Sequence, residues 1–422
     1  MAIASPRSKV LYVALAAACL VATGIYGWFA VRAYRAYRAS TKPDQVSLQS
    51  AIALEPQDAY YYDLLGRYLL FGTQQPALAV ERFRRATELN PHDSGYWLHL
   101  ALAYYNIGAE PQQQEAIRQA IAVDPTSPEV AWNAANFFLL QGNVTDALLQ
   151  FAVVLRHDPS MVTPSLDLCW RTLHDLGAIQ AIIPPDPSVY LQFIKLLSTK
   201  DEPEAAYHVW SALLQLNLQF DHQPALFYVD RLLEKGDVAR AQLVWGQLVS
   251  RSLTLQRYAS TDDLVVDGSF SQSILNAGFD WRYSSRPGVS LTLDTNDFHS
   301  GNRSLMVNYS DAGDDAGIYQ YVPVEPNKRY AVSAWVKSEE LATANGPCLS
   351  VSDVDDHTTY GSTEETAGTT SWHRVEREFQ TGPTAKLVAI HFVRNPGTTL
   401  IHGRFWAQEV SLRPVTQPLS VQ

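Results

Sequence analysis

The stretch Ser94–Pro125, SGYWLHLALAYYNIGAEPQQQEAIRQAIAVDP, contains two amphipathic segments and ends on a proline that recurs along the chain. Pro91, Pro125 and Pro159 are 34 residues apart, and each follows an Asn or Asp at the end of a segment with helical spacing. Pro56 precedes the first of them by 35 residues. A period of this length is typical of a helix–turn–helix unit that must stack on copies of itself to bury its apolar face. The spacing therefore predicts a helical solenoid, which is a scaffold and not a catalytic core.

The residues inside each period also indicate stacked helix pairs. Small side chains let the two helices of a unit approach closely, and large ones fill the space between units. In the unit that ends at Pro125, these positions carry Trp97, Leu100, Ala101, Tyr104, Ile117 and Ala120. The pattern resembles the tetratricopeptide repeat, whereas the competing interpretation, a generic helical bundle, does not explain the 34-residue spacing. We expect about five or six units over residues 44–258, with the last ones divergent.

Residues 10–31 contain no charged side chain and are long enough to cross a bilayer core of about 30 Å as a helix. Basic residues flank them, with residues 1–9 as a short tail and residues 32–43 as a basic juxtamembrane linker. We expect an uncleaved single-pass membrane anchor. The rival interpretations are a signal peptide, whose apolar region normally runs only about 7–15 residues, and a lipoprotein processing site at Cys19.

Stacked repeats present a concave groove lined by the first helix of each unit. Polar residues on or just after those helices, Asn106, Asn133 and Asn136, are the candidates for binding a peptide or helix of a protein partner. The other interpretation is that the repeats form a rigid spacer, which holds the C-terminal domain away from the membrane.

Composition argues against several classes of function. A net charge of −11, without a basic cluster beyond the N-terminal segment, argues against nucleic-acid binding. Cys19, Cys169 and Cys348 lie in separate segments and form neither a disulfide framework nor a metal-ligand spacing. The common nucleophile, zinc and phosphate-binding motifs are missing, so we expect no enzyme activity, no metal and no cofactor. Sequence spacing says nothing, however, about carboxylate pairs that meet only in the fold.

From residue 264 onward the helical periodicity stops. Short alternating apolar and polar runs follow, separated by Gly, Asn, Asp and Ser, and this pattern predicts an all-β sandwich over residues 264–414. The first expected strand is Leu264–Asp267, in a total of about nine, which fits a jelly roll. Residues 259–263 are the expected linker, and residues 415–422 are the expected tail.

Several short motifs in this half resemble a carbohydrate-binding module of the galactose-binding-like jelly-roll type. They are DGSF at 267–270, FHSGNRSLMV at 298–307, SWHRVEREF at 371–379 and FWAQEVSL at 405–412. The resemblance implies glycan binding and, in many such modules, a structural calcium ion. Ser271 and Gln408 stand where the family pattern often has acidic residues, so the calcium is left open.

Alternation along the expected strands identifies side chains that the core does not need. The expected outward set on one sheet face is Tyr319, Tyr321, Arg329, Trp335 and His391. Aromatic rings stack on the C–H faces of sugars and charged donors bind hydroxyl groups, so this set predicts glycan binding. A loop provides a second candidate set, Trp281, Arg282 and Tyr283. The alternative is that these aromatics dock the sandwich onto the repeats or fill a second core layer.

Together these features predict an α-then-β multidomain chain, with a transmembrane helix, an all-α tetratricopeptide-like solenoid and a C-terminal β-sandwich jelly roll. The function expected is that of a non-catalytic scaffold in cell-envelope or exopolysaccharide assembly, which binds a protein partner through the repeats and glycan through the sandwich. The alternative is a protein–protein interaction adaptor with a purely structural sandwich. More basic residues follow the span than precede it, which favours a cytoplasmic body. A glycan-binding domain has most use outside the cytoplasm, and on that ground we expect a periplasmic body.

Overall fold

The computed structural model describes residues 6–42, 44–259, 263–310, 315–394 and 400–415. Its helical half and its β-sandwich confirm the predicted fold class. The chain divides into two compact units, Met1–Phe193 and Ile194–Gln422. The division falls inside the repeats and not at the expected linker, because the last helices pack with the sandwich. Most of that linker and most of the expected tail lie outside the described residues.

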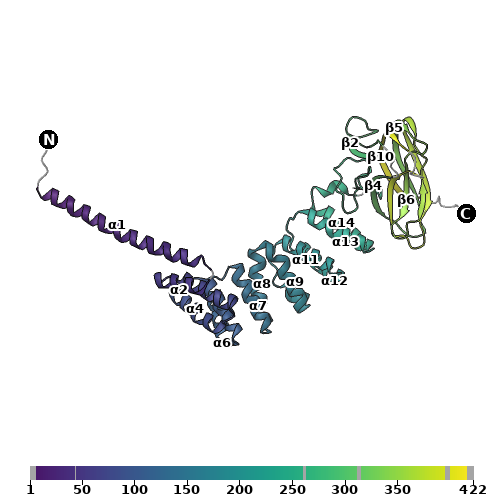
Figure 1. Cartoon of the computed structure of the whole chain (residues 1–422). Helices are drawn as coiled ribbons and strands as arrows, with labels where there is room; N and C mark the ends of the chain where they lie inside the picture. Colours follow the sequence, from purple (N-terminus) through teal and green to yellow (C-terminus); the bar gives the residue numbers. More distant parts are fainter. Residues whose placement is uncertain (1–5, 43, 260–262, 311–314, 395–399, 416–422) are drawn as a thin grey trace. The chain divides into compact units, whose positions relative to one another are not determined.

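The first unit contains the helices that the 34-residue period predicts, and Figure 1 shows them stacked as antiparallel hairpins. Its elements are α1 (Pro6–Ser40), α2 (Gln45–Leu54), α3 (Ala59–Arg67), the π-helical turn η1 (Tyr68–Gly72), α4 (Pro76–Leu89), α5 (Ser94–Asn106), α6 (Glu110–Val123), α7 (Pro128–Leu140), α8 (Val144–His157), the 3-10 turn η2 (Pro159–Met161), α9 (Val162–Leu173), α10 (Leu176–Gln180) and the start of α11 (Pro187–Thr199).

Capping residues begin the first helix of three successive repeats. The side chains of Asp58, Asp93 and Ser127 each accept a hydrogen bond from a backbone N–H in the first turn of α3, α5 and α7. Pro125 lies in the turn after α6, where a residue without an N–H cannot continue a helix. Caps and prolines at a constant spacing therefore set the helix boundaries that make the period visible.

Packing within a unit depends on small residues at the predicted positions. Gly66 of α3 lies against the ring of Phe83 in α4, and a Cβ at Gly66 would overlap that ring. Ala101 of α5 and Ala120 of α6 are completely buried. These close helix contacts explain why the same positions are small in successive units.

Helix α1 extends beyond the predicted membrane span. It continues to Ser40, so residues 32–40, which were expected to form a linker, are helical. The segment Val13–Ser40 is long and apolar enough to cross a membrane, and its most apolar part is exposed in the structure.

The C-terminal end of α1 packs against the first repeat. Arg32 donates two hydrogen bonds to Glu55, at the end of α2, with an Nε–Oε1 distance of 2.9 Å and an Nη2–Oε2 distance of 2.8 Å. Ala36 is completely buried against Ala51 and Tyr61. The C-terminal end of α1 and the first repeat therefore form one packed body.

The second unit begins with the end of α11. It continues with α12 (Pro203–Gln215), α13 (His222–Glu234), α14 (Val238–Arg251) and the 3-10 turn η3 (Leu255–Tyr258). Phe279, in the first loop of the sandwich, packs edge-on against Trp245 of α14, with ring centroids 6.1 Å apart. The hydroxyl of Tyr258 donates a 2.6 Å hydrogen bond to the carbonyl of Ser273. The last helical hairpin thus joins the sandwich directly.

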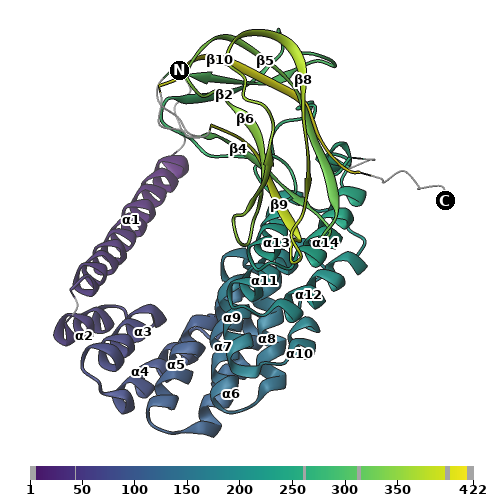
Figure 2. The same cartoon turned by 90° about the vertical axis from the view of Figure 1, so that its right-hand side faces the viewer.

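The described residues of the sandwich form two five-stranded antiparallel sheets, whose layers are visible in Figure 2. Sheet A has the order β1-β4-β9-β6-β7, and sheet B has the order β2-β3-β10-β5-β8. The strands are β1 (Arg282–Tyr283), β2 (Val289–Asp294), β3 (Ser304–Tyr309), β4 (Asp315–Pro323), β5 (Arg329–Ala342), β6 (Cys348–Asp353), β7 (Thr359–Ser362), β8 (Gly368–Gln380), β9 (Leu387–Val393) and β10 (His402–Pro414).

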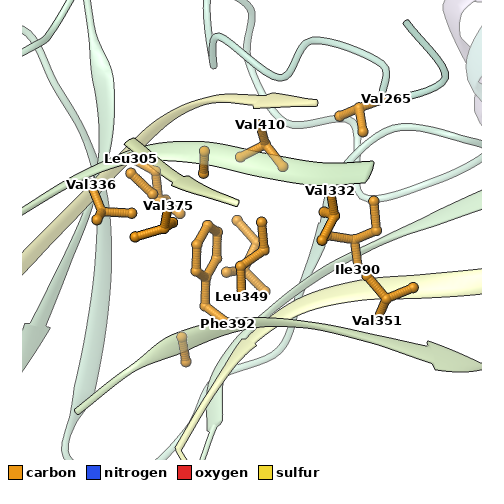
Figure 3. Close-up of a cluster of buried hydrophobic side chains, with 14 of the residues drawn as sticks. Val265, Leu305, Val332, Val336, Leu349, Val351, Val375, Ile390, Phe392 and Val410 are labelled. Atoms are coloured by element: carbon orange, nitrogen blue, oxygen red, sulfur yellow. The ribbon is translucent and has the colours of Figure 1, made fainter. Parts of the chain in front are cut away.

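The hydrophobic core lies between the two sheets. Figure 3 shows Val332 and Val336 of sheet B packed in one cluster with Leu349 and Phe392 of sheet A, and all four side chains are buried. Inward positions alternate along most strands as the sequence predicts, and the alternation shifts where β5 and β10 contain bulges. Away from these bulges, the pattern shows which side of its own sheet each residue occupies.

One expected strand is wrong. Leu264–Asp267 forms bends and turns, and Asp267 has a left-handed φ of 44°. The backbone of Val266 does not join a sheet ladder; its N–H and C=O bond to the side-chain amide of Gln320, at 2.8 and 2.7 Å. A buried side chain here replaces the neighbouring strand.

Candidate functional site

A row of polar and aromatic residues crosses the outer face of sheet A. Arg282 pairs with Tyr319, Tyr319 pairs with His391, His391 pairs with Ser350, and Ser350 pairs with Ser362. Directly paired residues on neighbouring strands have their side chains on the same side of a sheet. Since Ile318 and Ile390 lie in the core, the alternation places this whole row on the outside of the sandwich.

Side chains of this row and the adjoining Tyr321 make contacts at its two ends, and Ser350, near the β7 end, is buried. The rings of Tyr319 and Tyr321 are 5.2 Å apart between centroids, and the Arg282 guanidinium carbon lies 5.3 Å from the Tyr321 ring centroid. Ser362 donates a 3.0 Å hydrogen bond to Ser350. Stacking faces and hydroxyl groups side by side are the chemistry that binds sugar rings. We call these five outward residues of β1, β4, β9, β6 and β7, together with Tyr321, the sheet A face.

Burial sets the protonation of two groups on the sheet A face. It lowers the pKa of His391, against a smaller opposing effect of the Asp315 carboxylate, so the imidazole is neutral at pH 7. Burial also raises the pKa of the Tyr321 phenol. Both side chains are therefore uncharged hydrogen-bonding groups at neutral pH.

Arg282 also contacts the helical repeats. Its Nη2 donates to the Oδ1 of Asp230 in α13, and to the carbonyl of Gly278 at 2.8 Å. The same Asp230 oxygen accepts a 2.7 Å hydrogen bond from the N–H of Gly278. The loop that was the second candidate for glycan binding therefore docks the sandwich onto α13 through Arg282. The alternative interpretation of the sequence anticipates this contact.

The other two residues of that loop have different surroundings. Trp281 is completely buried, packs on Phe270 at a ring distance of 4.8 Å, and donates from Nε1 to the carbonyl of Asp267 at 3.1 Å. Its ring is core and not a binding surface. Tyr283 is 50% exposed and lines a hollow of about 270 Å³ together with Ile274, which is apart from the sheet A face.

The expectation that Tyr319, Tyr321, Arg329, Trp335 and His391 share one face is wrong. Arg329 and Trp335 belong to β5 in sheet B, whereas the other three belong to sheet A. Alternation shows that a side chain points away from the core, but it does not show which of two opposed sheets the strand joins. The two groups therefore lie on opposite outer surfaces of the sandwich.

The sheet B residues are already engaged with protein. The imidazole of His299 stacks flat on Trp335, with ring centroids 3.8 Å apart and an interplanar angle of 14°. Arg329 forms an ion pair with Glu378 of β8. Beside Trp335 lies a cavity of about 650 Å³ whose lining also includes Arg374 and Glu376, which bind each other at 3.3 Å. One face of the Trp335 ring is therefore covered by His299.

The two positions that leave calcium open are occupied by hydrogen bonds. Gln408 is buried, its Oε1 accepts from the N–H of His299 at 2.7 Å and of Ser300 at 3.2 Å, and its Nε2 donates to the carbonyl of Ser300 at 2.5 Å. Ser271 donates from its N–H and from its hydroxyl to the Oδ1 of Asp267, both at 2.8 Å. Across the described residues, no group of three or more His, Cys, Asp or Glu side chains is arranged to hold a metal ion.

The three candidate groove residues bind their own helices. The side-chain amides of Asn106, Asn133 and Asn136 each donate to the carbonyl four residues earlier, at 2.8, 2.8 and 2.7 Å. The sequence analysis missed a polar contact between two successive repeats. The Nδ1 of His99 in α5 lies 2.6 Å from the buried side chain of Asp63 in α3.

Residues missing from the sequence prediction complete the sheet A face and its border. Ser350 and Ser362 belong to the face because β6 pairs with β9 and β7. Asp230 lies in a helix, 52 residues before Arg282, and binds Arg282 at the edge of the face. The outward alternation of β6 is a signal that could have found Ser350. No local pattern could have found Asp230.

The fold therefore combines stacked helical hairpins with a two-sheet β-sandwich of the jelly-roll type. Residues 68–112 and 114–162 match the tetratricopeptide repeat family, and residues 262–398 match the family described as carbohydrate binding domain. The chain therefore contains tetratricopeptide repeats and a domain of the carbohydrate-binding type. No curated protein sequence matches it.

Solved structures are similar to each half separately. A structure titled "CBM4 structure and function" is 16% identical, covers 36% of this chain and 99% of its own, and has a TM-score of 0.28. A structure of MamA is 12% identical, with 41% of this chain and 86% of that chain covered and a TM-score of 0.27. PilW, titled a type IV pilus biogenesis factor, is 19% identical, with 47% and 96% covered and a TM-score of 0.26. These similarities concern the fold alone.

Proposed function

We propose that this protein is a membrane-anchored, non-catalytic scaffold that binds polysaccharide through the sheet A face and a protein partner through its repeats. The observation that carries the glycan part is the unbroken cross-strand row from Arg282 to Ser362, with Tyr321 beside it. The family matches support both binding modes. A scaffold that holds glycan and protein together suits cell-envelope or exopolysaccharide assembly.

The glycan proposal is tested by binding of the full-length protein, in detergent, to a broad glycan array. Tyr319→Ala and Tyr321→Ala should each weaken retention of the bound glycan about fivefold, because a stacked ring contributes on the order of 1 kcal/mol. Tyr105→Ala is the matched control, since Tyr105 is 48% exposed on α5 in the other compact unit. An array on which the unmodified protein retains nothing would contradict the proposal.

The second candidate is an adaptor with a purely structural sandwich. It is favoured by the docking of the 278–282 loop on Asp230, and by the burial of Trp281 in the core. Under this proposal, Tyr319→Ala and Tyr321→Ala would lower the melting temperature and no glycan would be retained. The array and a melting curve of the same variants therefore separate the two functions.

The membrane part of the proposal places the anchor at residues 10–31 and both folded units outside the cytoplasm. It is supported by the length and apolar composition of α1 and by the use of a carbohydrate-binding domain beyond the inner membrane. A reporter that is active only in the cytoplasm, fused after Gln422, should be inactive. An active fusion would show that the C-terminus lies in the cytoplasm and would contradict the proposed orientation.

For the repeats, we expect a peptide or helix to lie along the first helices near Asn106, Asn133 and Asn136. The stacked architecture of α5 and α7 supports this, because successive first helices line a common surface. Photo-crosslinking from residues 94–140 in native membranes should recover a specific partner. Recovery of none would favour a rigid spacer.

A further inference from the structure

Arg282 belongs to two structures at once. Its guanidinium lies over the Tyr321 ring on the sheet A face, and it also forms an ion pair with Asp230 of α13. Both partners of the ion pair are largely shielded, since the side chain of Arg282 is 14% exposed and that of Asp230 is 25% exposed. The positive charge of Arg282 at the β1 end of the face is thus neutralised by a carboxylate that the helical repeats supply.

The neighbouring arginine is paired as well. Arg286 lies at the same end of sheet A, where its Cγ approaches Gly317 of β4, and its Nη2 is 3.4 Å from the Oδ2 of Asp315. The remaining members of the row are phenol, imidazole and hydroxyl groups. An acidic polysaccharide would therefore bring carboxylates towards Asp230 and Asp315 without an unpaired cation among these residues to receive them.

We propose that the sheet A face selects neutral over acidic polysaccharides, and that Asp230 sets this selectivity by neutralising Arg282. The inference rests on the proposed glycan-binding function and adds its substrate class. It also assigns a specificity-determining role to a residue of the helical repeats. The binding unit is then the sandwich together with α13, because the sandwich without α13 presents Arg282 as a free cation.

The test uses the full-length protein in detergent, with Asp230→Asn as the main variant. Glu234→Gln is the matched control, because Glu234 lies one turn further along α13, loses the same charge, and pairs with Arg231 instead of with the sandwich. The immobilised probes are two pairs with a common backbone, hydroxyethylcellulose with carboxymethylcellulose and methyl-esterified with de-esterified pectin. Binding is measured by interferometry at low salt, with a melting curve for every variant.

The unmodified protein and Glu234→Gln should bind the neutral member of a pair better than the acidic one. Asp230→Asn should gain roughly threefold to tenfold in affinity for the acidic member, which is the effect of one partly shielded charge pair. The double variant Asp230→Asn/Arg282→Gln should lose this gain. Arg282→Gln alone is a second test that does not depend on the folding of Asp230→Asn. This variant should still prefer the neutral member of each pair.

Three results would overturn the inference while leaving glycan binding in place: equal binding of both members by the unmodified protein, no difference between Asp230→Asn and Glu234→Gln, or a gain that survives in the double variant. Binding of none of the four polysaccharides by the unmodified protein would overturn the proposed glycan function, and this inference with it.

Discussion

Gly278, in the first loop of the sandwich, lies against the indole of Trp245 in α14 so closely that a Cβ on Gly278 would overlap the six-membered ring. Its φ of +61° also falls in the left-handed region that favours glycine. Space and backbone conformation both require glycine here. Close approach of the first sandwich loop to Trp245 therefore depends on glycine at position 278.

Gly278→Ala should destabilise the protein by about 2–4 kcal/mol, because left-handed strain is added to overlap with Trp245. Gly236→Ala is the control, since Gly236 has a similar φ of +71° and an added Cβ there meets nothing within 4 Å. That control should cost only about 1 kcal/mol. Chemical denaturation measures the free energy of unfolding of both variants. Equal losses of stability would show that the Trp245 ring moves aside at little cost.

Trp335→Ala should lower the melting temperature and leave glycan binding unchanged. The Trp335 ring supports the loop that carries His299, through a stacked contact at 3.8 Å, and truncation would leave that loop without its packing surface. We expect a loss of about 2–3 kcal/mol, somewhat below that of a fully buried tryptophan. Melting curves and glycan retention are measured on the same samples. A variant that melts normally but fails to retain glycan would move the binding site to sheet B.

Stability should fall as the pH rises from about 4 to about 7 and then level off, because of Asp280. Burial raises the pKa of this carboxyl to about 7, its Oδ2 accepts a 2.7 Å hydrogen bond from the N–H of Leu275, and its Oδ1 has no partner among the described residues. The unfolded chain releases the proton near pH 4, roughly the value for an exposed aspartate. The folded state keeps it, so the contribution is complete below about pH 4 and is lost as the pH passes 7.

Asp280→Asn, which cannot ionise, should flatten this dependence between pH 5 and pH 8. The variant should be the more stable protein at pH 8, by no more than about 4 kcal/mol. Melting temperatures at the two pH values provide the measurement. Parallel pH profiles for variant and unmodified protein would show that Asp280 titrates normally.

Gln408→Ala should destabilise the sandwich by about 2–4 kcal/mol, because it leaves backbone groups of His299 and Ser300 without partners. A chelator should not change the melting temperature of the unmodified protein, since Gln408 is uncharged and its amide is already hydrogen-bonded to the backbone of His299 and Ser300. Gln408→Glu should become stabilised by added calcium. A chelator-sensitive unmodified protein would mean that calcium is bound despite Gln408.

The repeats could be predicted closely because each unit solves the same packing problem locally. Positions equivalent to Pro125 and Ala101 carry proline and small residues in other repeats, at a fixed spacing. The buried contacts that they permit lie within one hairpin. The expected linker over residues 32–43 is helical as far as Ser40. Residues 32–40 contain neither Gly nor Pro, so nothing in them ends a helix.

The candidate site was predicted only in part, because it depends on pairing between distant strands. Tyr319 and Trp335 alternate in the same way along their own strands, yet β4 pairs with β9 whereas β5 pairs with β10. Strand order is a property of the whole sandwich and leaves no local trace. The Asp230–Arg282 ion pair likewise joins a helix to a strand that belongs to another predicted domain.

The clamp between Arg32 and Glu55 has a mechanical consequence. A membrane helix tilts by about 20° on average, and the angle changes with bilayer thickness. Most anchored domains are free of such changes because a flexible segment follows the span. Here an unbroken helix runs to Ser40 and is fastened to the first repeat. If α1 crosses a bilayer as proposed, it acts as a lever, and each degree of tilt turns the first repeat by the same amount.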